Sequence, residues 1–282
     1  NRRLNPQRAF FEDMGSFVTR NHLRRMPVTL ESLKQVDLDK AMAIYQDRFA
    51  DASDFTFVFV GNIDLPTFKP LVERYLASLP NKSRGEKWKD VGVKRPRGVK
   101  TLNVNKGLEP KSALYLSFHG KQKWTKDDEN DMTMLGEVLS IRLREILRED
   151  MGGVYGSYSY GSISRVPKQK RDFTVYFGCA PENVDKLKKA VMKEIAAIQK
   201  KGIGADYIDK VKKGRTRQHE VDMKENWYWA SKLSSAYRYG DDPKGILEFD
   251  KFVAKVSSKR VKAAARKYLK KNQYILAILR PE

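Results

Sequence analysis

The sequence predicts an α+β fold in two layers, in which helices cover one face of a mixed, mostly antiparallel β-sheet. Apolar periodicities follow the order strand, helix, strands, helix, strands, helices, strand, which is typical of helices packed on a sheet. Hydrophobic residues make up 40% of the 282 residues, enough for a large core. The longest apolar runs have the length of strands, well short of the roughly 20 residues that cross a bilayer, so we expect no membrane span.

Helices are expected over residues 1–50. Apolar side chains recur there at helical spacing: Phe10, Phe11, Met14, Phe17, Val18, and later Leu38, Met42 and Tyr45. Thr29 and Asp37 stand where helix N-caps are expected, because their side-chain oxygens can accept a backbone N–H. This region has helices without a sheet and should pack on something else. We therefore assign residues 1–50 to the helical tail of a preceding domain, and residues 51–282 to a final α+β domain.

A first strand is expected over residues 54–62, where apolar side chains from Phe55 to Val60 occupy both faces. That pattern indicates a central strand covered on both sides. A helix through Phe68 and Leu71 should follow it. The basic stretch 82–100 contains Gly and Pro, and we expect it to be an exposed connection with little regular structure.

Two strands, residues 99–105 and 113–119, are expected to lead into a long helix. The apolar residues of this helix share one face: Met132, Leu135, Leu139, Leu143 and Ile146. The helix should end at Arg148, since Gly152 and Gly153 then separate it from the next strand.

The rest of the chain is expected to complete the sheet and its helical layer. Residues 155–164 and 171–179 predict an antiparallel pair with a turn around Pro167. A helix closed by Gly202 follows, with its apolar residues on one face: Val184, Leu187, Val191, Ile195 and Ile198. The remaining expected elements are two helical stretches and a closing strand, residues 206–239, 257–270 and 274–279.

The cysteine and histidine content limits the kinds of site. The single cysteine, Cys179, can form neither an internal disulfide nor a Cys-rich metal site, and we interpret it as a buried structural thiol. The three histidines lie far apart in sequence, and none belongs to a His-x-x-Glu-His motif: His22, His119 and His219. No zinc ligand set is therefore visible.

The chain is strongly basic, with 56 Lys and Arg against 35 Asp and Glu and a net charge of +21. Such a field attracts polyanions and acidic peptides. The basic residues are spread over predicted helix surfaces, so solvated helix faces are the favoured interpretation and a nucleic-acid partner is not expected.

Arg148 and Tyr155 form the most informative pair in the sequence. They stand seven residues apart, across the predicted helix end and the glycine turn. A guanidinium and a phenol can both donate hydrogen bonds, which suits a site that grips a carbonyl or an oxyanion. Neither group is a ready nucleophile or base near neutral pH, so the pair does not suit unaided hydrolysis.

Three segments in this order resemble the pitrilysin/insulinase family of zinc peptidases. They are residues 45–64, which include FTFVFVGNID; residues 71–80, LVERYLASLP; and residues 147–155, LREDMGGVY. The last segment is similar to the Arg-x6-Tyr motif of the C-terminal, non-zinc half of that family. The resemblance covers almost the whole chain from residue 27 to residue 281.

The resemblance implies a two-half enzyme that closes around a peptide or an unfolded polypeptide. In that arrangement Tyr155 would help to stabilise the tetrahedral oxyanion, and Arg148 would position the peptide backbone. Zinc and the general base would come from an N-terminal half, in cis or in trans, because this chain has no His-x-x-Glu-His. The chain alone is therefore expected to be inactive and to bind no zinc.

The sequence begins without Met, and we expect it to be part of a longer polypeptide. Family resemblance favours the bacterial periplasm or cell envelope. Two alternatives stay open: a non-catalytic scaffold or interaction subunit of the same fold, and, less favoured, a polyanion or nucleic-acid binder. Arg148 could also be a solvated arginine near a helix end, and Tyr155 a half-buried strand aromatic.

Overall fold

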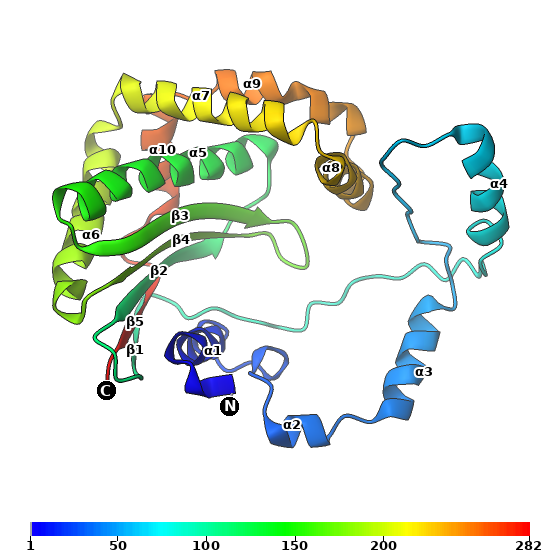
Figure 1. The fold of residues 1–282 in the computed structure, drawn as a ribbon, viewed down its shortest axis with the longest axis horizontal. Helices are drawn as coiled ribbons and strands as arrows, with labels where there is room; N and C mark the ends of the chain where they lie inside the picture. Colours follow the sequence, from blue (N-terminus) through cyan, green and yellow to red (C-terminus); the bar gives the residue numbers. More distant parts are fainter. Residues whose placement is uncertain (1) are drawn as a thin grey trace. The chain divides into compact units, whose positions relative to one another are not determined.

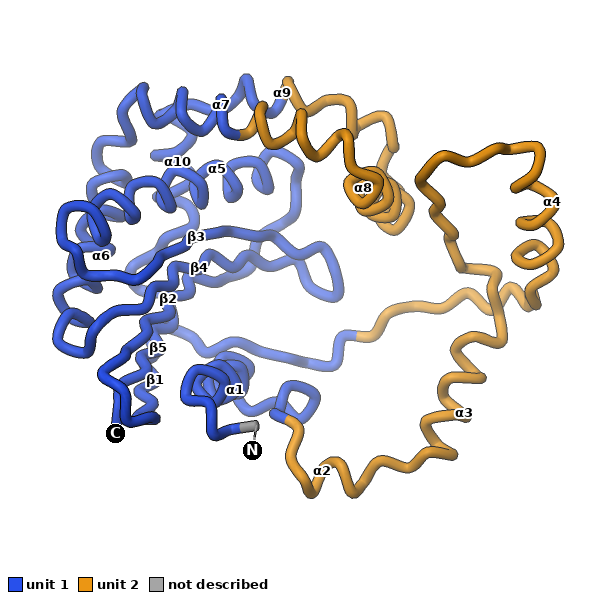
Figure 2. Tube along the Cα trace, viewed as in Figure 1, with its two compact units in different colours: residues 1–27, 90–214, 252–282 blue, residues 28–89, 215–251 orange. Residues whose placement is uncertain are grey.

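The computed structural model describes residues 2–282 (Figure 1). The chain divides into two compact units (Figure 2). Unit 1 comprises the chain up to Pro27 together with residues 90–214 and 252–282, and unit 2 comprises residues 28–89 and 215–251. These units do not test the domain boundary predicted near residue 50, which stays a prediction.

Unit 1 contains a five-stranded sheet with the strand order β1-β5-β2-β4-β3. The strands are β1 (Val99–Asn105), β2 (Ser112–Lys121), β3 (Val154–Ser164), β4 (Lys170–Cys179) and β5 (Tyr274–Arg280). β1 pairs parallel to β5, while β5, β2, β4 and β3 pair antiparallel. The mixed, mostly antiparallel sheet is therefore confirmed.

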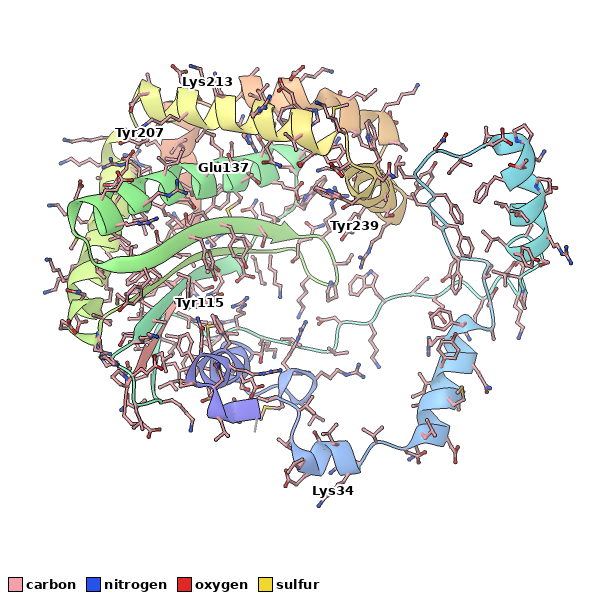
Figure 3. The ribbon with its side chains drawn as sticks, in the orientation of Figure 1. Lys34, Tyr115, Glu137, Tyr207, Lys213 and Tyr239 are labelled. Carbon is pink, nitrogen blue, oxygen red and sulfur yellow. The ribbon has the colours of Figure 1, made fainter. Side chains whose placement is uncertain are left out.

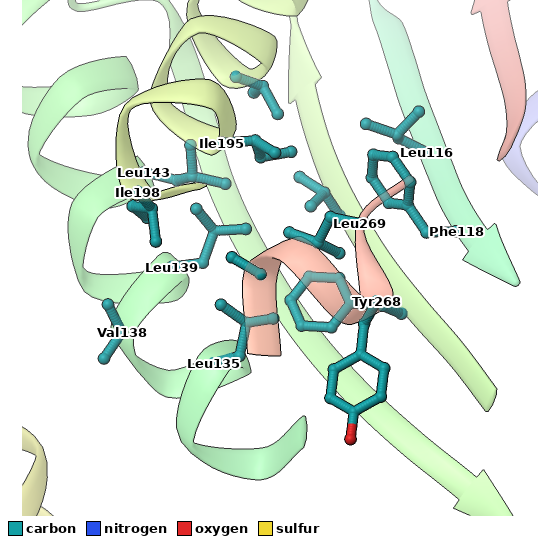
Figure 4. Packing of buried hydrophobic residues seen from close by; sticks show 14 of the residues in the cluster. Leu116, Phe118, Leu135, Val138, Leu139, Leu143, Ile195, Ile198, Tyr268 and Leu269 are labelled. Atoms are coloured by element: carbon teal, nitrogen blue, oxygen red, sulfur yellow. The ribbon is translucent and has the colours of Figure 1, made fainter. Parts of the chain in front are cut away.

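One face of this sheet is covered by helices, as the sequence predicts. The covering helices are α5 (Lys126–Leu143), α6 (Val184–Lys201) and α10 (Ser258–Tyr268). Leu116, Leu139 and Ile195 pack in the main core between the two layers (Figure 4). Cys179 is also buried in this core, and burial raises the pKa of its thiol to about 11.

The opposite face of the sheet carries one further helix, α1 (Pro6–Val18). Asn5 caps it by accepting the N–H of Arg8. The helix packs on β1 and β5, where a second apolar cluster forms: Phe10, Met14, Val18, Val104, Ala113, Ile275, Ala277 and Leu279. Of the helices expected over residues 1–50, α1 therefore packs on the sheet of the same chain.

Small residues allow α5 to lie unusually close to β3. A Cβ added at Gly136 would stand 3.0 Å from the Cα of Tyr160. One turn further on, the Oγ of Ser140 donates to the carbonyl of Ser159 at 2.9 Å and accepts its N–H at 3.0 Å. Since these backbone groups of Ser159 point away from β4, Ser140 protects part of the open edge of the sheet.

Unit 2 is mostly helical. It contains α2 (Leu30–Lys34), α3 (Leu38–Phe49), α4 (Leu65–Tyr75) and α8 (Asn226–Tyr239), while α7 (Ala205–Asp222) and α9 (Phe249–Ala254) each run from one unit into the other. Thr29 and Asp37 cap α2 and α3, as predicted.

The strand predicted over residues 54–62 is wrong for this chain. The segment has no strand partner in the described part of the chain, although it retains the apolar alternation of a strand. A β-strand requires hydrogen bonds from a neighbouring backbone, and no segment of residues 28–89 belongs to a sheet. The exposed connection predicted over residues 82–100 is confirmed up to the start of β1.

Candidate functional site

The candidate site is the junction between the end of helix α5 and the start of strand β3, around residues 144–156. α5 continues as a turn of π-helix (Arg144–Asp150), and two glycines then close it. The N–H of Gly152 donates to the carbonyl of Arg148 at 3.1 Å, and that of Gly153 to the carbonyl of Leu147 at 2.9 Å. Gly152 has a φ of +58°, a conformation that favours glycine. These bonds fix the backbone on both sides of the turn.

Gly153 is also required for space. A Cβ at this position would lie 2.8 Å from Cδ2 of Leu187, a buried residue of α6. The junction is therefore held against the core as well as by its own hydrogen bonds.

The side chain of Arg148 is exposed at the end of the π-helical turn. Among the residues that the structure describes, its guanidinium makes no hydrogen bond or ion pair. An exposed guanidinium in this position is free to take a carbonyl or carboxylate as its partner.

Tyr155 is 69% exposed and follows directly after buried Val154. A β-bulge between Val154 and Gly156 interrupts the pairing with β4. The Tyr155 ring lies over Gly178, 3.9 Å from where its Cβ would be, and Gly178 shares the face of Tyr176 in β4. The bulge thus turns Tyr155 onto the face opposite the main core.

Five tyrosines lie on this face, and together we call them the tyrosine face: Tyr115, Tyr155, Tyr158, Tyr160 and Tyr176. The rings of Tyr158 and Tyr176 stack with centroids 5.2 Å apart, and those of Tyr158 and Tyr160 are 6.2 Å apart. Tyr115, labelled in Figure 3, contacts Thr174 through its hydroxyl at 3.2 Å. Burial raises the pKa of Tyr115 and of Tyr158, so both phenols stay neutral at physiological pH.

α1 borders the tyrosine face. Gln7 donates through Nε2 to the hydroxyl of Tyr176 at 2.7 Å, and the ring of Phe11 lies 5.7 Å from that of Tyr176. The part of the face that extends along β3 is more open, and Tyr160 and Tyr155 are its most exposed members.

A polar network that sequence reasoning missed supports the helix carrying Arg148. Arg142 donates to Glu194 at 2.7 Å and to Glu145 at 3.0 Å, and Tyr207 (Figure 3) donates to Glu145 at 2.5 Å. Burial disfavours the charged form of Glu145, but the hydrogen bonds from Tyr207 and Arg142 outweigh it and lower its pKa. The network links the end of α5 to α6 and α7. Its members are far apart in sequence, so no local pattern could reveal it.

The two predicted site residues therefore lie at the same junction, but their side chains are not in contact through a described hydrogen bond. Arg148 and Tyr155 flank the same glycine turn, and no hydrogen bond between their side chains is described. Residues 2–282 contain no group of three or more His, Cys, Asp or Glu side chains placed to bind a metal ion. No described helix is both long and apolar enough to span a membrane.

The fold and the junction define an α+β domain in which one turn carries an exposed arginine and an exposed tyrosine. The chain belongs to the family described as the peptidase M16 inactive domain, whose sequence pattern matches residues 35–215. This membership confirms the resemblance to the non-zinc half of pitrilysin/insulinase peptidases.

Two curated relatives are named as zinc proteases. The probable zinc protease PqqL of Haemophilus influenzae is 25% identical over 254 residues, which cover 89% of this chain and 27% of that protein. The zinc protease PQQL-like of Arabidopsis thaliana is 28% identical over 227 residues, covering 75% of this chain and 24% of that protein. The chain thus spans about a quarter of the length of these relatives.

Solved structures share the fold. The periplasmic protease PqqL from Escherichia coli matches with a TM-score of 0.80 at 20% identity, over 99% of this chain and 31% of that one. A peptidase M16 inactive domain from Pseudomonas fluorescens matches with a TM-score of 0.78 at 16% identity, over 100% of this chain and 66% of that one. A chain of complex III from Candida albicans matches with a TM-score of 0.72 at 13% identity, over 98% of this chain and 67% of that one.

Proposed function

We propose that this chain is the substrate-gripping, C-terminal part of a zinc endopeptidase. The observation that carries the proposal is the glycine junction, which holds an exposed arginine and an exposed tyrosine on either side of one turn. Membership of the M16 inactive-domain family and the names of the two curated relatives support the reaction class.

Tyr155 is the proposed oxyanion donor. A phenol near neutral pH offers one O–H, and when a peptide carbonyl becomes tetrahedral its oxygen becomes a stronger acceptor. A donor that acts on charge formed only in the transition state is worth about 3 kcal/mol in comparable sites. The β-bulge supports this role, since it directs the phenol away from the core.

Arg148 is the proposed positioning group. Its permanent charge and several N–H donors suit the carbonyls of an extended peptide backbone. Because the carbonyl oxygen of Arg148 is held by Gly152, a change in the turn would move the guanidinium and the phenol together.

The described residues of this chain do not fit a zinc ion, so zinc in the full enzyme would be held elsewhere. A zinc-bearing N-terminal half, on the same polypeptide or as a partner subunit, would supply metal-activated water and the general base. The tyrosine face extends away from Tyr155 along β3 and is the proposed surface for the peptide or unfolded polypeptide substrate.

The test is peptide hydrolysis by the full-length gene product with Tyr155→Phe and Arg148→Ala. A fall in kcat/KM supports the assigned roles, and unchanged kinetics for both variants would remove them.

The proposal extends to the compartment, for which we infer the bacterial periplasm or cell envelope. The support is the solved E. coli relative, which is described as periplasmic. Cell fractionation with immunodetection of the chain checks this inference, and recovery in the cytosol would contradict it.

A non-catalytic scaffold of the same fold is the second candidate. Its support is the shared fold with a chain of complex III, at an identity that carries no information on activity. A scaffold predicts that the partner half also lacks His-x-x-Glu-His, which the sequence of the full-length gene decides.

A further inference from the structure

A pocket outside the candidate site lies where helices α6 and α10 end. Its volume is about 450 Å³, which suits a small molecule. It is lined by one residue of α6, one of α10 and the residues that lead from α10 toward β5: Gln199, Arg266, Leu269, Lys270, Lys271 and Asn272. Because α6 and α10 cover the main core, the pocket lies on the other side of the sheet from the tyrosine face.

Hydrogen bonds hold the inner part of this pocket in place. Gln199 donates through Nε2 to the carbonyls of Ala265 at 3.1 Å and of Leu269 at 2.8 Å. The Nε of Arg266 donates to the carbonyl of Gln199 at 2.6 Å. Leu269 is buried in the main core (Figure 4), so the bonds are anchored to a fixed part of the molecule. The end of α6 and the end of α10 are therefore joined at the pocket.

The rim of the pocket is positively charged. Four exposed lysines belong to its lining or follow Gln199 directly: Lys200, Lys201, Lys270 and Lys271. None of the four makes an ion pair in the described part of the chain, and residues 195–205 and 258–273 contain no Asp or Glu. Cations around a concave site, without acids between them, raise the local concentration of anions.

These cations exceed what the two helix ends require. Basic side chains are common in the last turn of a helix, because they offset the partial negative charge of its free carbonyls. Here Gln199 and Arg266 already donate to carbonyls at these ends. The acids of α5 that reach α10 pair with Arg260 and Lys267. The lysines of the pocket therefore have their charges available for another partner.

We propose that this pocket binds the phosphate group of an organic phosphate. Arg266, Lys270 and Lys271 supply the charged contacts, and the side-chain amide of Asn272 supplies a further donor. The ligand is either a soluble phosphate compound or the headgroup of an anionic phospholipid, which share this chemistry. The proposed site does not depend on any catalytic role of Arg148 or Tyr155.

The charge and the size of the pocket favour phosphate over carboxylate. A phosphate monoester carries close to two negative charges and three acceptor oxygens in a small volume, which matches three cations around one pocket. A single carboxylate carries one charge, and the carboxylates of an acidic polypeptide are spread along an extended chain. The aliphatic stems of the lysines offer apolar surface to the organic part of the ligand.

Binding measurements on the full-length gene product test the proposal with two probes. Inorganic tripolyphosphate, titrated by calorimetry, represents a soluble phosphate. Vesicles of equimolar phosphatidylglycerol and phosphatidylcholine, assayed by flotation, represent a lipid headgroup. Binding of either probe supports the proposal and identifies the source of the phosphate. Binding of neither probe would overturn it, as would stronger binding of polyglutamate than of tripolyphosphate.

A matched pair of double variants locates the binding. Lys270→Glu with Lys271→Glu should raise the Kd of the probe that binds by about tenfold or more. Lys186→Glu with Lys189→Glu changes the net charge equally at exposed positions near the other end of α6, and should leave the Kd within about twofold. Equal weakening by the two double variants would overturn the proposal, because the general field of the chain would then explain the binding.

Asn272→Asp is a second variant of the pocket that keeps every cation and nearly the same shape. It places a carboxylate in the lining and should also raise the Kd by about tenfold. The temperature of unfolding should stay unchanged, because the Asn272 side chain is exposed and makes no described hydrogen bond. A Kd that neither Asn272→Asp nor the Lys270 and Lys271 substitutions alter would overturn the assignment of this pocket.

Discussion

Gly153 lies against Leu187, so close that a Cβ at position 153 would stand 2.8 Å from Cδ2 of the leucine. This contact links the turn that carries Arg148 and Tyr155 to helix α6 on the core side of the sheet. It explains why the second glycine of the pair has a normal φ and is nevertheless required: the first provides the backbone conformation and the second provides the space.

Replacement of Gly153 by Ala should therefore destabilise the protein by about 1–3 kcal/mol, because Leu187 is buried and cannot move freely. Urea unfolding of the 282-residue chain measures this cost. The cost should be smaller in a Leu187→Ala background, where the clash is absent. Gly156→Ala is the matched control, since a Cβ there meets nothing within 4 Å. Equal losses for the two glycine variants would contradict the packing account.

Ser140→Ala should weaken the attachment of α5 to β3. The substitution removes the bonds to the N–H and the carbonyl of Ser159, and we expect a loss of about 1–3 kcal/mol. Hydrogen exchange at the amide of Ser159 reports on this edge directly and should accelerate. Ser162→Ala, at an exposed position of the same strand, should change neither quantity.

Asp128 should make stability depend on pH in the acid range. Burial disfavours its charge, but hydrogen bonds from Lys267 at 2.6 Å and Tyr268 at 2.8 Å outweigh burial and lower its pKa. A carboxyl group with a lowered pKa in the folded state stabilises the protein above its unfolded pKa, and this contribution is lost as the pH falls. The free energy of unfolding should therefore drop as the pH falls below about 5 and through the lowered pKa of Asp128.

The control for this pH dependence is a pair of amide substitutions. Asp128→Asn should lower stability at pH 7 and flatten the decline on acidification. Glu129→Gln changes the neighbouring, exposed carboxylate and should preserve the decline. A full decline in the Asp128→Asn variant would assign the acid sensitivity to other groups.

Much of unit 1 could be predicted from local pattern. The sequences of β2 and β4 are alternating or continuously apolar, and the burial of their side chains follows that pattern. The apolar face of α5 is likewise the face that is buried in the core. Residues 54–60 could not be predicted correctly in this way. Their strand propensity can be recognised from the local sequence, but the presence of a partner strand cannot. The packing of α1 on the second face of the sheet could not be predicted from the sequence either, because it depends on contacts with β1 and β5, which lie far from α1 along the chain.

The sequence suggests which residues form the candidate site, and their role stays a prediction; the geometry of the junction could not be predicted from the sequence. Simple alternation would place Tyr155 on the face opposite Tyr158 and Tyr160, because the numbers differ in parity. The bulge at Val154 and Gly156 reverses this and brings all three to one face. The supporting bonds of Arg142 join helices that only the folded chain brings together.

The most direct test of the central claim compares the hydrolysis of a fluorogenic peptide by the full-length gene product with that by three variants. Tyr155→Phe should lower kcat by about 100-fold with little change in KM, because the lost bond forms in the transition state. Arg148→Ala should lower kcat/KM, and Tyr160→Phe, which removes a hydroxyl from the same face, should change kcat less than about twofold. A Tyr155→Phe variant as active as the Tyr160→Phe control would contradict the account.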